Sequence, residues 1–330
     1  MKAVVIARPG GPEVLELREV PPPEPGHGQI LVRVRASALN RADLLQREGR
    51  YPAPPGDPRD VPGIEFAGEV SGLGPGTREW RVGDRVFGII GGGAHAEYAV
   101  VHERAVARVP DELDWEQAGA IPEAFITAHD ALITQAATRP SERVLVHAVG
   151  SGVGLAALQL ARACGALPYG TSRTGDKIER ARQHGLVDGA AVGSDLSVLT
   201  EAVGRWSSGG GMHVVLDLLG GPYLQASIAA LGPRGRLVLI GTIAGPRAEL
   251  PIGVVMSKRL TIIGTVLRAR PLEEKIVATR AFAEQVVPLL ARKVASAVVD
   301  SVFPLSAIGD AHRRMESNET FGKVVVRCDS

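Results

Sequence analysis

Three glycines, Gly150, Gly152 and Gly154, lie between a short apolar run, Val144–His147, and an alanine-rich segment with helical spacing. Glycines at a strand-to-helix turn let the backbone approach a phosphate, and the following helix begins with unpaired N–H groups and a positive dipole end. The spacing is G-x-G-x-G, so Leu155 occupies the sixth position of the usual dinucleotide fingerprint. A tight turn without a ligand would give the same pattern, so the flanking elements have to decide.

Positive charges follow the next strand-like run, LPYGT, which ends in Thr171, Ser172 and Arg173. A site for NAD commonly places Asp or Glu here for the ribose 2′-hydroxyl, and no acid is present at the end of this run. Arg173 and Lys177 are placed to meet a 2′-phosphate, which Arg binds well through its planar set of donors. The pattern favours NADP(H) over NAD(H), with two solvated charges in a turn as the alternative.

Composition excludes several other classes of function. The 37 Lys and Arg residues nearly cancel the 36 Asp and Glu residues, so the charge of a nucleic-acid or anionic-membrane binder is missing. Only two cysteines occur, Cys164 and Cys328, too few for a disulfide framework and without the paired spacing of a zinc site. Neither a signal peptide nor an apolar run of membrane-spanning length is recognisable. We therefore expect a cytoplasmic protein that acts on a small molecule.

Two sequence textures predict two domains. Residues 1–123 contain short strand-like runs between prolines and glycines, with apolar residues at alternate positions from Ile30 to Ala38, which predicts a mostly β domain. Residues 124–267 alternate apolar strands with helical segments, which predicts a doubly wound α/β domain. Residues 268–330 begin with a long predicted helix, 271–293, and alternate too little to extend a parallel sheet. We expect them to return to the first domain, making it discontinuous.

A resemblance to a known family runs from one end of the chain to the other. It is carried by ALNRADLLQREGRYPAPPG, PGIEFAGEV, WRVGDRVFGIIGGGAHAEYA, HAVGSGVGLAALQLA, IIGTVLRARPLEEK and HRRMESNETFGKVV. These segments resemble the medium-chain dehydrogenase/reductase superfamily and, within it, the zinc-free quinone oxidoreductases. The resemblance implies a GroES-like β domain, a Rossmann domain, NADPH as cofactor and an active site in the cleft between the domains.

The activity that this resemblance implies is transfer of hydride from nicotinamide to a quinone or an activated alkene. Reduction of a 2-alkenal or an enoyl thioester on the same scaffold is one alternative. A non-catalytic, NADPH-binding sensor or structural protein is another, because some relatives have lost turnover. Fold and cofactor follow more firmly from such a resemblance than the substrate does.

No zinc is expected at the catalytic position. Zinc-dependent relatives have a Gly-His-Glu motif where this chain has Gly63-Ile64-Glu65, and isoleucine cannot ligate a metal. Some other group must then bind the negative charge that develops on the acceptor oxygen. The candidates are the amide of Asn40 and the phenol of Tyr51, which lies in a loop with five prolines, Arg50–Gly63. The alternatives are that Asn40 caps the next helix and that Tyr51 packs on prolines.

The resemblance also implies which residues bind the cofactor. The glycine turn would hold the pyrophosphate, the residues after the second strand the 2′-phosphate, and a third group would lie near the nicotinamide half. Thr127 could equally be a buried threonine bonded to its own helix. Val192 replaces a Tyr that is common near the adenosine ribose, so one contact is lost. The full set is Asn40, Thr127, Gly150, Ser151, Gly152, Val153, Ser172, Arg173, Lys177, Ile240, Gly241, Leu267 and Lys323.

Two further expectations concern the histidines and the oligomer. His95, His129 and His147 are expected to be structural or surface residues. The run Leu260–Leu267 is apolar and rich in β-branched residues at the predicted sheet edge, so we expect a homodimer, or a tetramer built from dimers, through this strand. The resemblance implies the same assembly, because members of that family dimerise at this edge. A loop near 246–253 that covers the edge is the alternative.

Overall fold

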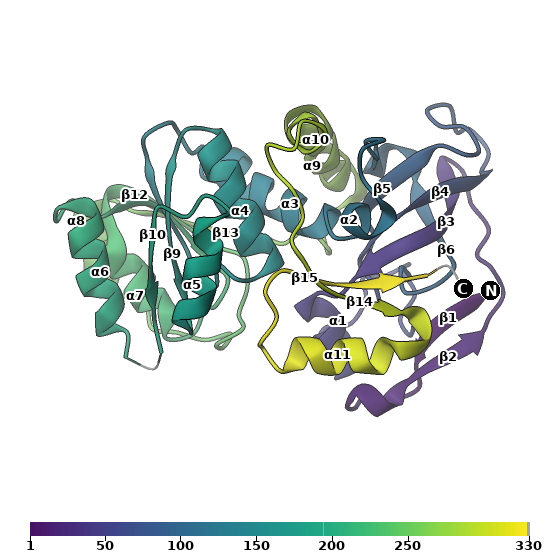
Figure 1. The fold of residues 1–330 in the computed structure, drawn as a ribbon, viewed down its shortest axis with the longest axis horizontal. Coiled ribbons are helices and arrows are strands. Elements are labelled where there is room, and N and C mark those ends of the chain that lie inside the picture. The colour runs from purple at the N-terminus through teal and green to yellow at the C-terminus, as the bar shows by residue number, and fades with distance from the viewer. Residues whose placement is uncertain (194, 329–330) are drawn as a thin grey trace. The chain divides into compact units, whose positions relative to one another are not determined.

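The computed structural model describes residues 1–193 and 195–328, and it divides into two units (Figure 1). Unit 1 comprises Met1–Ile126 and Leu267–Ser330, and unit 2 comprises Thr127–Val266. Helix α3, Pro122–His129, runs through the first boundary. The sequence predicts that boundary between residues 123 and 124. A division inside a continuous helix carries no turn signal, so its exact position cannot be predicted from sequence.

Unit 1 is built on a seven-stranded sheet with the order β14-β15-β3-β4-β5-β7, in which β6 also pairs with β3. A separate antiparallel pair, β1 and β2, lies outside this sheet. The strands are β1 (Lys2–Ile6), β2 (Leu15–Glu19), β3 (Gln29–Ala38), β4 (Glu65–Leu73), β5 (Arg85–Ile89), β6 (Tyr98–His102), β7 (Val106–Arg108), β14 (Val299–Pro304) and β15 (Lys323–Arg327). The helices are α1 (Arg41–Arg47), α2 (Trp115–Gly119), α9 (Leu272–Gln285), α10 (Val287–Ala291) and α11 (Ile308–Glu316).

Strand β3 is the centre of this sheet. The alternating apolar side chains from Ile30 to Ala38 that predicted it are all buried. Strand β4 pairs with it antiparallel along most of its length, β6 pairs with its first half, Gln29–Arg33, and β15 pairs with its last residues, with Val325 opposite Ala38. The strand could be predicted because one of its faces is buried in the core, which gives its apolar side chains a period of two.

The C-terminal segment returns to unit 1, where β14 and β15 form a parallel pair (Figure 1, yellow). The single long helix expected over 271–293 is wrong, because the helix breaks at Val286 into α9 and α10. Pro288 explains the break. Its ring clashes with the carbonyl four residues earlier in a continuous helix, whereas proline is tolerated in the first turn of a new one.

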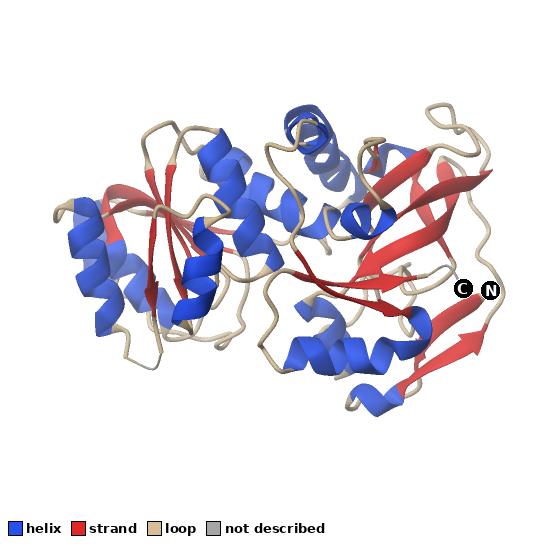
Figure 2. Ribbon diagram, viewed as in Figure 1, coloured by secondary structure: helices blue, strands red, loops and turns tan. Residues whose placement is uncertain are grey.

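Unit 2 contains a six-stranded parallel sheet with the order β10-β9-β8-β11-β12-β13. This is the strand order of a doubly wound nucleotide-binding fold, as expected. The strands are β8 (Arg143–Val146), β9 (Leu167–Ser172), β10 (Asp188–Ala191), β11 (Met212–Asp217), β12 (Leu231–Leu239) and β13 (Thr261–Gly264). Helices flank both faces of the sheet (Figure 2). They are α4 (Gly152–Ala163), α5 (Gly175–Arg182), α6 (Ser197–Ser207), α7 (Tyr223–Ala230) and α8 (Ile252–Lys258).

Among the residues that the structure describes, no helix combines the length and apolar character needed to cross a lipid bilayer.

Candidate cofactor and catalytic site

The turn between β8 and α4 is held closed by its own side chains and by β9. Ser151 is the N-cap of α4, and its hydroxyl accepts the N–H of Gly154 at 3.0 Å. The N–H of Val149 donates to the carbonyl of Thr171 at 3.0 Å. A Cβ atom on Gly154 would lie 2.5 Å from the carbonyl oxygen of Ala148, so only glycine fits there. The turn therefore packs tightly enough to require its third glycine.

The donors of this turn suit a phosphate. The first four N–H groups of a helix have no partner within the helix. In α4 those of Gly154 and Leu155 bind Ser151, so Gly152 and Val153 supply the two that would face a ligand. The first turn of α4 carries no acidic residue. An anion at this position would meet amide donors and the positive dipole end without a competing carboxylate.

The predicted 2′-phosphate residues follow β9 directly. Ser172 is the last residue of the strand and is buried, Arg173 is exposed, and Lys177 lies half-buried in the first turn of α5. Arg173 lies close enough to Tyr223 to oppose the rise that burial causes in the pKa of that phenol. Asp176 also lies in this turn, and a hydrogen bond from Thr174 lowers the pKa of its carboxyl group. Positive charge exceeds negative charge at the end of β9.

The loop after β12 meets the end of β11. The N–H groups of Ile240 and Gly241 donate to the carbonyl of Asp217 at 2.8 and 3.4 Å. A Cβ atom on Gly241 would lie 2.6 Å from the carbonyl oxygen of Leu218, so the two loops approach as closely as glycine allows. Thr127 is buried on α3. The sequence predictions for Ile240, Gly241 and Thr127 thus fall on well-packed backbone in unit 2.

Val192, at the position where the resemblance implies a tyrosine, is buried in the core cluster of unit 2. Its N–H donates to the carbonyl of Ser172 at 2.7 Å. The position therefore has a packing role and presents no aromatic side chain to a ligand.

In unit 1, Asn40, Glu65 and Lys323 form a buried polar cluster. Lys323 Nζ donates to Asn40 Oδ1 at 2.6 Å and to the carbonyl of Leu39 at 3.0 Å, and it lies 2.7 Å from Glu65 Oε1. Asn40 Nδ2 donates to Glu65 Oε1 at 2.8 Å and to the carbonyl of Ala38 at 3.3 Å. The second carboxylate oxygen of Glu65 accepts a backbone N–H at 2.8 Å. Every donor of the ammonium and of the amide has an acceptor.

This cluster limits what two of the predicted site residues, Lys323 and Asn40, can donate to a ligand. Lys323 has no hydrogen left for a cofactor while its three partners hold it, and Asn40 would have to exchange a bond to donate to an acceptor molecule. Asn40 is the N-cap residue of α1, and its N–H is bound by the carboxylate of Asp43 at 2.7 Å. Sequence reasoning missed Glu65 as the centre of the cluster. The feature that could have revealed it is a glutamate within an apolar strand-like run, because a buried carboxylate needs a cation beside it.

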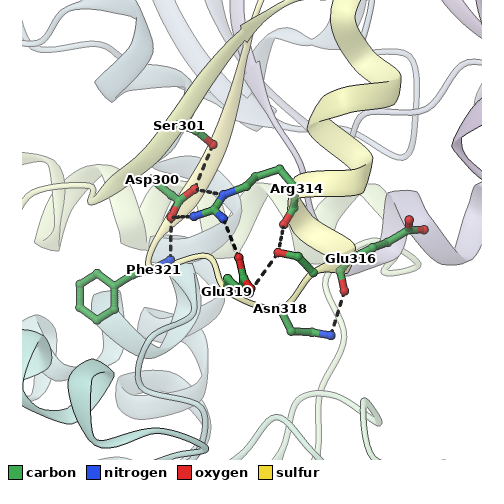
Figure 3. Close-up of polar contacts among 8 residues, drawn as sticks. Asp300, Ser301, Arg314, Glu316, Asn318, Glu319 and Phe321 are labelled. Carbon is green, nitrogen blue, oxygen red and sulfur yellow. Dashed lines mark hydrogen bonds and ion pairs between the residues drawn. The ribbon is translucent and has the colours of Figure 1, made fainter.

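The loop that leads into Lys323 is fixed by a second ionic cluster (Figure 3). Arg314 on α11 donates through two nitrogens to the two carboxylate oxygens of Asp300 on β14, at 3.0 and 3.1 Å. Asp300 also accepts the N–H of Phe321 at 2.9 Å and the hydroxyl of Ser301 at 3.0 Å. These bonds lower the pKa of the Asp300 carboxyl group against the opposing effect of burial. The start of β15 is therefore anchored to both neighbouring elements.

Tyr51 lies half-buried at the start of the proline-rich loop, and its ring faces a cation. The guanidinium carbon of Arg268 is 5.0 Å from the ring centroid, within cation–π range. Arg268 is buried, and it donates to the carbonyls of Gly91 at 2.7 Å and Tyr51 at 3.3 Å and to the side chain of Gln46. Burial lowers the pKa of Arg268, while Asp43, Tyr51 and Asp57 oppose the change. Arg268 was not singled out from the sequence, and Leu267 beside it is buried.

Ile64, at the position that the resemblance assigns to a zinc ligand, has an apolar side chain and is buried. Within residues 1–193 and 195–328, no group of three or more His, Cys, Asp or Glu side chains is arranged to hold a metal ion. His95, His129 and His147 are all buried, so they belong to the interior and not to the surface.

Comparisons with known proteins find relatives for both parts of the chain. Residues 26–111 match the family model described as the alcohol dehydrogenase GroES-like domain, and residues 152–284 match the zinc-binding dehydrogenase model. A quinone oxidoreductase of Pseudomonas aeruginosa is 33% identical over 330 residues, which cover 98% of this chain and 99% of that protein. The pikromycin polyketide synthase component PikAII of Streptomyces venezuelae is 41% identical over 237 residues, 71% of this chain and 6% of that protein. The structure of Escherichia coli quinone oxidoreductase complexed with NADPH superposes with a TM-score of 0.87 at 28% identity, covering 99% and 100% of the two chains.

Proposed function

Because this chain belongs to the quinone oxidoreductase family of the medium-chain dehydrogenases and reductases, we propose that it reduces a quinone or an activated alkene with NADPH and without a metal. Bound NADPH would supply the hydride from its nicotinamide ring. The observation that carries the proposal is the phosphate-compatible turn before α4 together with the cationic end of β9. The protein's part is to bind, orient and stabilise charge.

Unit 2 would hold the cofactor. The N–H groups of Gly152 and Val153 would bind the pyrophosphate, and Gly150 and Ser151 shape the turn that presents them. Arg173 and Lys177 would bind the 2′-phosphate, with Ser172 beside them. Ile240, Gly241 and Thr127 of unit 2, with Leu267 of unit 1, remain proposed neighbours of the nicotinamide half on the strength of the resemblance. Val192 is buried and would not contact the adenosine ribose, so this chain would lack the contact that a tyrosine makes there.

The cofactor assignment is tested by binding. NADPH should bind more tightly than NADH, because the extra phosphate gains two cations, and Arg173→Ala should remove most of that difference. Arg205→Ala, which removes an exposed arginine from the last turn of α6, is the matched control and should leave the ratio of the two dissociation constants unchanged. Equal dissociation constants for the two cofactors in the unaltered protein would refute the assignment.

Tyr51 would donate a hydrogen bond to the acceptor oxygen as negative charge develops there. A fully engaged donor of this kind is worth about 10²–10³ in kcat, and a reactive quinone needs less. Tyr51→Phe should therefore lower kcat/KM most for the least reactive acceptors, whereas Tyr98→Phe, on β6, should not. Asn40 would support this site from the N-cap of α1, and Asn40→Ala tests whether its amide exchanges a bond during turnover. Wild-type kcat/KM in both variants across several acceptors would contradict these roles.

Metal independence is supported by what stands where relatives place zinc. Ile64 offers no lone pair, and the carboxylate of Glu65 already has a cation in Lys323. Dialysis against a strong chelator should leave the rate unchanged. Stoichiometric zinc in the purified protein, lost together with activity, would contradict the proposal.

The alternative acceptor class is a 2-alkenal or an enoyl thioester. The observation that favours it is the higher identity, 41%, to a stretch of a polyketide synthase than to the quinone oxidoreductases. A panel containing a naphthoquinone, a phenanthrenequinone, a 2-alkenal and an enoyl thioester, assayed with both cofactors, separates the two. Steady consumption of NADPH with any of them also excludes a non-catalytic sensor or structural role.

We also propose a homodimer through β13, which is one of the two outer strands of the unit 2 sheet. Thr261 and Gly264 of this strand are exposed, and on the adjacent helix α8 Ile252 is 62% and Met256 71% exposed. Pairing the strand with its two-fold copy would satisfy its free edge.

Sedimentation equilibrium tests this assembly and should give twice the 34.6 kDa mass, or four times that mass for a tetramer. Ile263→Pro should dissociate the dimer, because proline cannot donate a hydrogen bond across the edge. A monomer at micromolar concentration, or an unchanged assembly in the proline variant, would refute it. Cys164 and Cys328 form no disulfide in the described chain, which suits the reducing cytoplasm that we propose as the location.

A further inference from the structure

Four buried polar side chains form a line across the carboxyl ends of three neighbouring strands in unit 2. His147 follows β8, Thr171 is in β9, Asp217 ends β11, and Ser227 lies on α7. His147 Nδ1 is 2.8 Å from Thr171 Oγ1, and His147 Nε2 is 3.0 Å from Ser227 Oγ. Ser227 Oγ is in turn 3.1 Å from Asp217 Oδ2. All four side chains are buried.

Asp217 sets the direction of the first hydrogen bonds in this line. Its carboxylate accepts the hydroxyl proton of Ser227, so the oxygen of that hydroxyl is left to accept the proton of His147 Nε2. Burial lowers the pKa of His147, which favours the neutral imidazole although Asp217 opposes the change. In the neutral ring with its proton on Nε2, Nδ1 accepts the hydroxyl of Thr171.

The two ends of the line hold the loops that would bind the cofactor. The carbonyl of Thr171 accepts the N–H of Val149 in the glycine turn, and Ser172 and Arg173 follow Thr171 directly. The second oxygen of Asp217 accepts the N–H groups of Leu219 and Gly220 at 2.8 and 2.9 Å. A shift in this line would therefore move loops from all three strands.

Tyr223 closes the line from one side. Its ring meets the ring of His147 edge to face, with 5.3 Å between the centroids. Tyr223 is also near Arg173, whose charge opposes the rise that burial causes in the pKa of its phenol. The aromatic contact excludes water from His147 and adds a second path from the histidine to the cationic end of β9.

We propose that His147 is a positioning residue for NADPH, which fixes the end of β9 so that Arg173 meets the 2′-phosphate, and that it does so as the neutral imidazole protonated on Nε2. The proposal rests on the proposed cofactor. Ser227 has no nucleophilic role in this arrangement, because its proton is directed at Asp217 and not at His147.

The protonation state is tested first and without cofactor. Nitrogen-15 NMR of the histidine side chains, with His147 assigned by its loss in His147→Gln, should show the neutral Nε2–H form at neutral pH. The opposite tautomer, or an imidazolium, would overturn the proposal. This readout does not depend on NADPH, so it remains decisive even if the proposed function fails.

The positioning role is tested by cofactor discrimination. Thr171→Val removes the donor to Nδ1 while keeping the shape of the side chain, and His147→Leu removes both bonds. Because a single neutral hydrogen bond is worth roughly fivefold to tenfold in an equilibrium, each variant should weaken NADPH by about that factor and NADH less. His147→Gln, which has one donor and one acceptor, should recover much of the loss.

A matched control separates positioning from folding. Ser207→Ala removes another buried serine of unit 2, whose hydroxyl bonds to Val203 and Gly211 before β11 begins. It should lower stability without changing the ratio of the NADPH and NADH dissociation constants. If Thr171→Val lowers stability but leaves this ratio at the wild-type value, the role is structural only and the proposal is wrong. If His147→Leu does not fold, Thr171→Val and the NMR measurement still decide.

Discussion

Removing the ammonium group of Lys323 should destabilise unit 1 strongly and leave NADPH binding unchanged. In Lys323→Met the apolar stem is kept, but the carboxylate of Glu65 loses the cation that it pairs with in the described chain. Asn40 Oδ1 and the carbonyl of Leu39 lose a donor at the same time. A direct cofactor ligand would behave in the opposite way, with weaker binding and little loss of stability.

The size of the effect follows from burial. Breaking a buried ion pair by removing one partner costs about 3–5 kcal/mol, because the remaining charge stays uncompensated. For a domain of this size, each kcal/mol corresponds to roughly 2–4 °C, so the Tm of unit 1 should fall by roughly 6–20 °C. Glu65→Gln combined with Lys323→Met should recover part of the loss, since the buried charge is then gone while an acceptor for Asn40 remains.

Tryptophan fluorescence can follow unit 1 alone. Trp80 and Trp115 lie in unit 1 and Trp206 in unit 2, so urea or thermal unfolding in a Trp206→Phe background reports on unit 1. The double variant Glu65→Gln, Lys323→Met is the control that shows how much of the lost stability comes from the uncompensated charge of Glu65. If Lys323→Met unfolds at the wild-type midpoint but binds NADPH more weakly, Lys323 is a cofactor ligand and our reading of the buried cluster is refuted.

Three further outcomes are expected. Burial lowers the pKa of His95 and His312 below the ordinary 6.5, so in acid the unfolded chain takes up protons that the folded chain does not. Stability in urea should therefore be full above about pH 6.5 and should fall below it; a flat profile would contradict this. Gly154→Ala should cost about 1–3 kcal/mol in unit 2 and weaken NADPH, as calorimetry would show. Arg268→Gln should lower kcat/KM, and in a double-mutant cycle its effect should not add to that of Tyr51→Phe; full additivity would separate the two residues.

The periodic elements could be predicted from the sequence, and the unpatterned ones could not. Strand β3 was visible because its alternating side chains are buried on one face. Strand β10 was not, because Asp188–Ala191 contains no large apolar residue. Strand β2 was missed for a related reason, since four of its five residues are exposed. The alternation of apolar and polar residues arises from burial of one face, so a strand without a buried apolar face shows no such alternation.

The site could be predicted in its local parts only. The glycine turn and the charges after β9 are contiguous in sequence, so their chemistry was readable. The partners of Lys323 were not, because Asn40 lies 283 residues away and only the fold brings the two together. The same holds for Arg268 under Tyr51 and for the line through His147, each joining segments that no spacing rule connects.

The place of β15 between β14 and β3 in the unit 1 sheet has a consequence for synthesis on the ribosome. Unit 2 is one continuous segment and can fold as soon as it emerges, whereas the last residues of β3, Ala36–Ala38, lack their partner strand and Glu65 lacks its counter-ion until β15 has been made. The nascent N-terminal segment therefore waits with an open strand edge and a carboxylate that cannot yet be buried, while the inserted unit is completed. Chaperone engagement during translation should fall on the first 126 residues, and release should coincide with the arrival of β15.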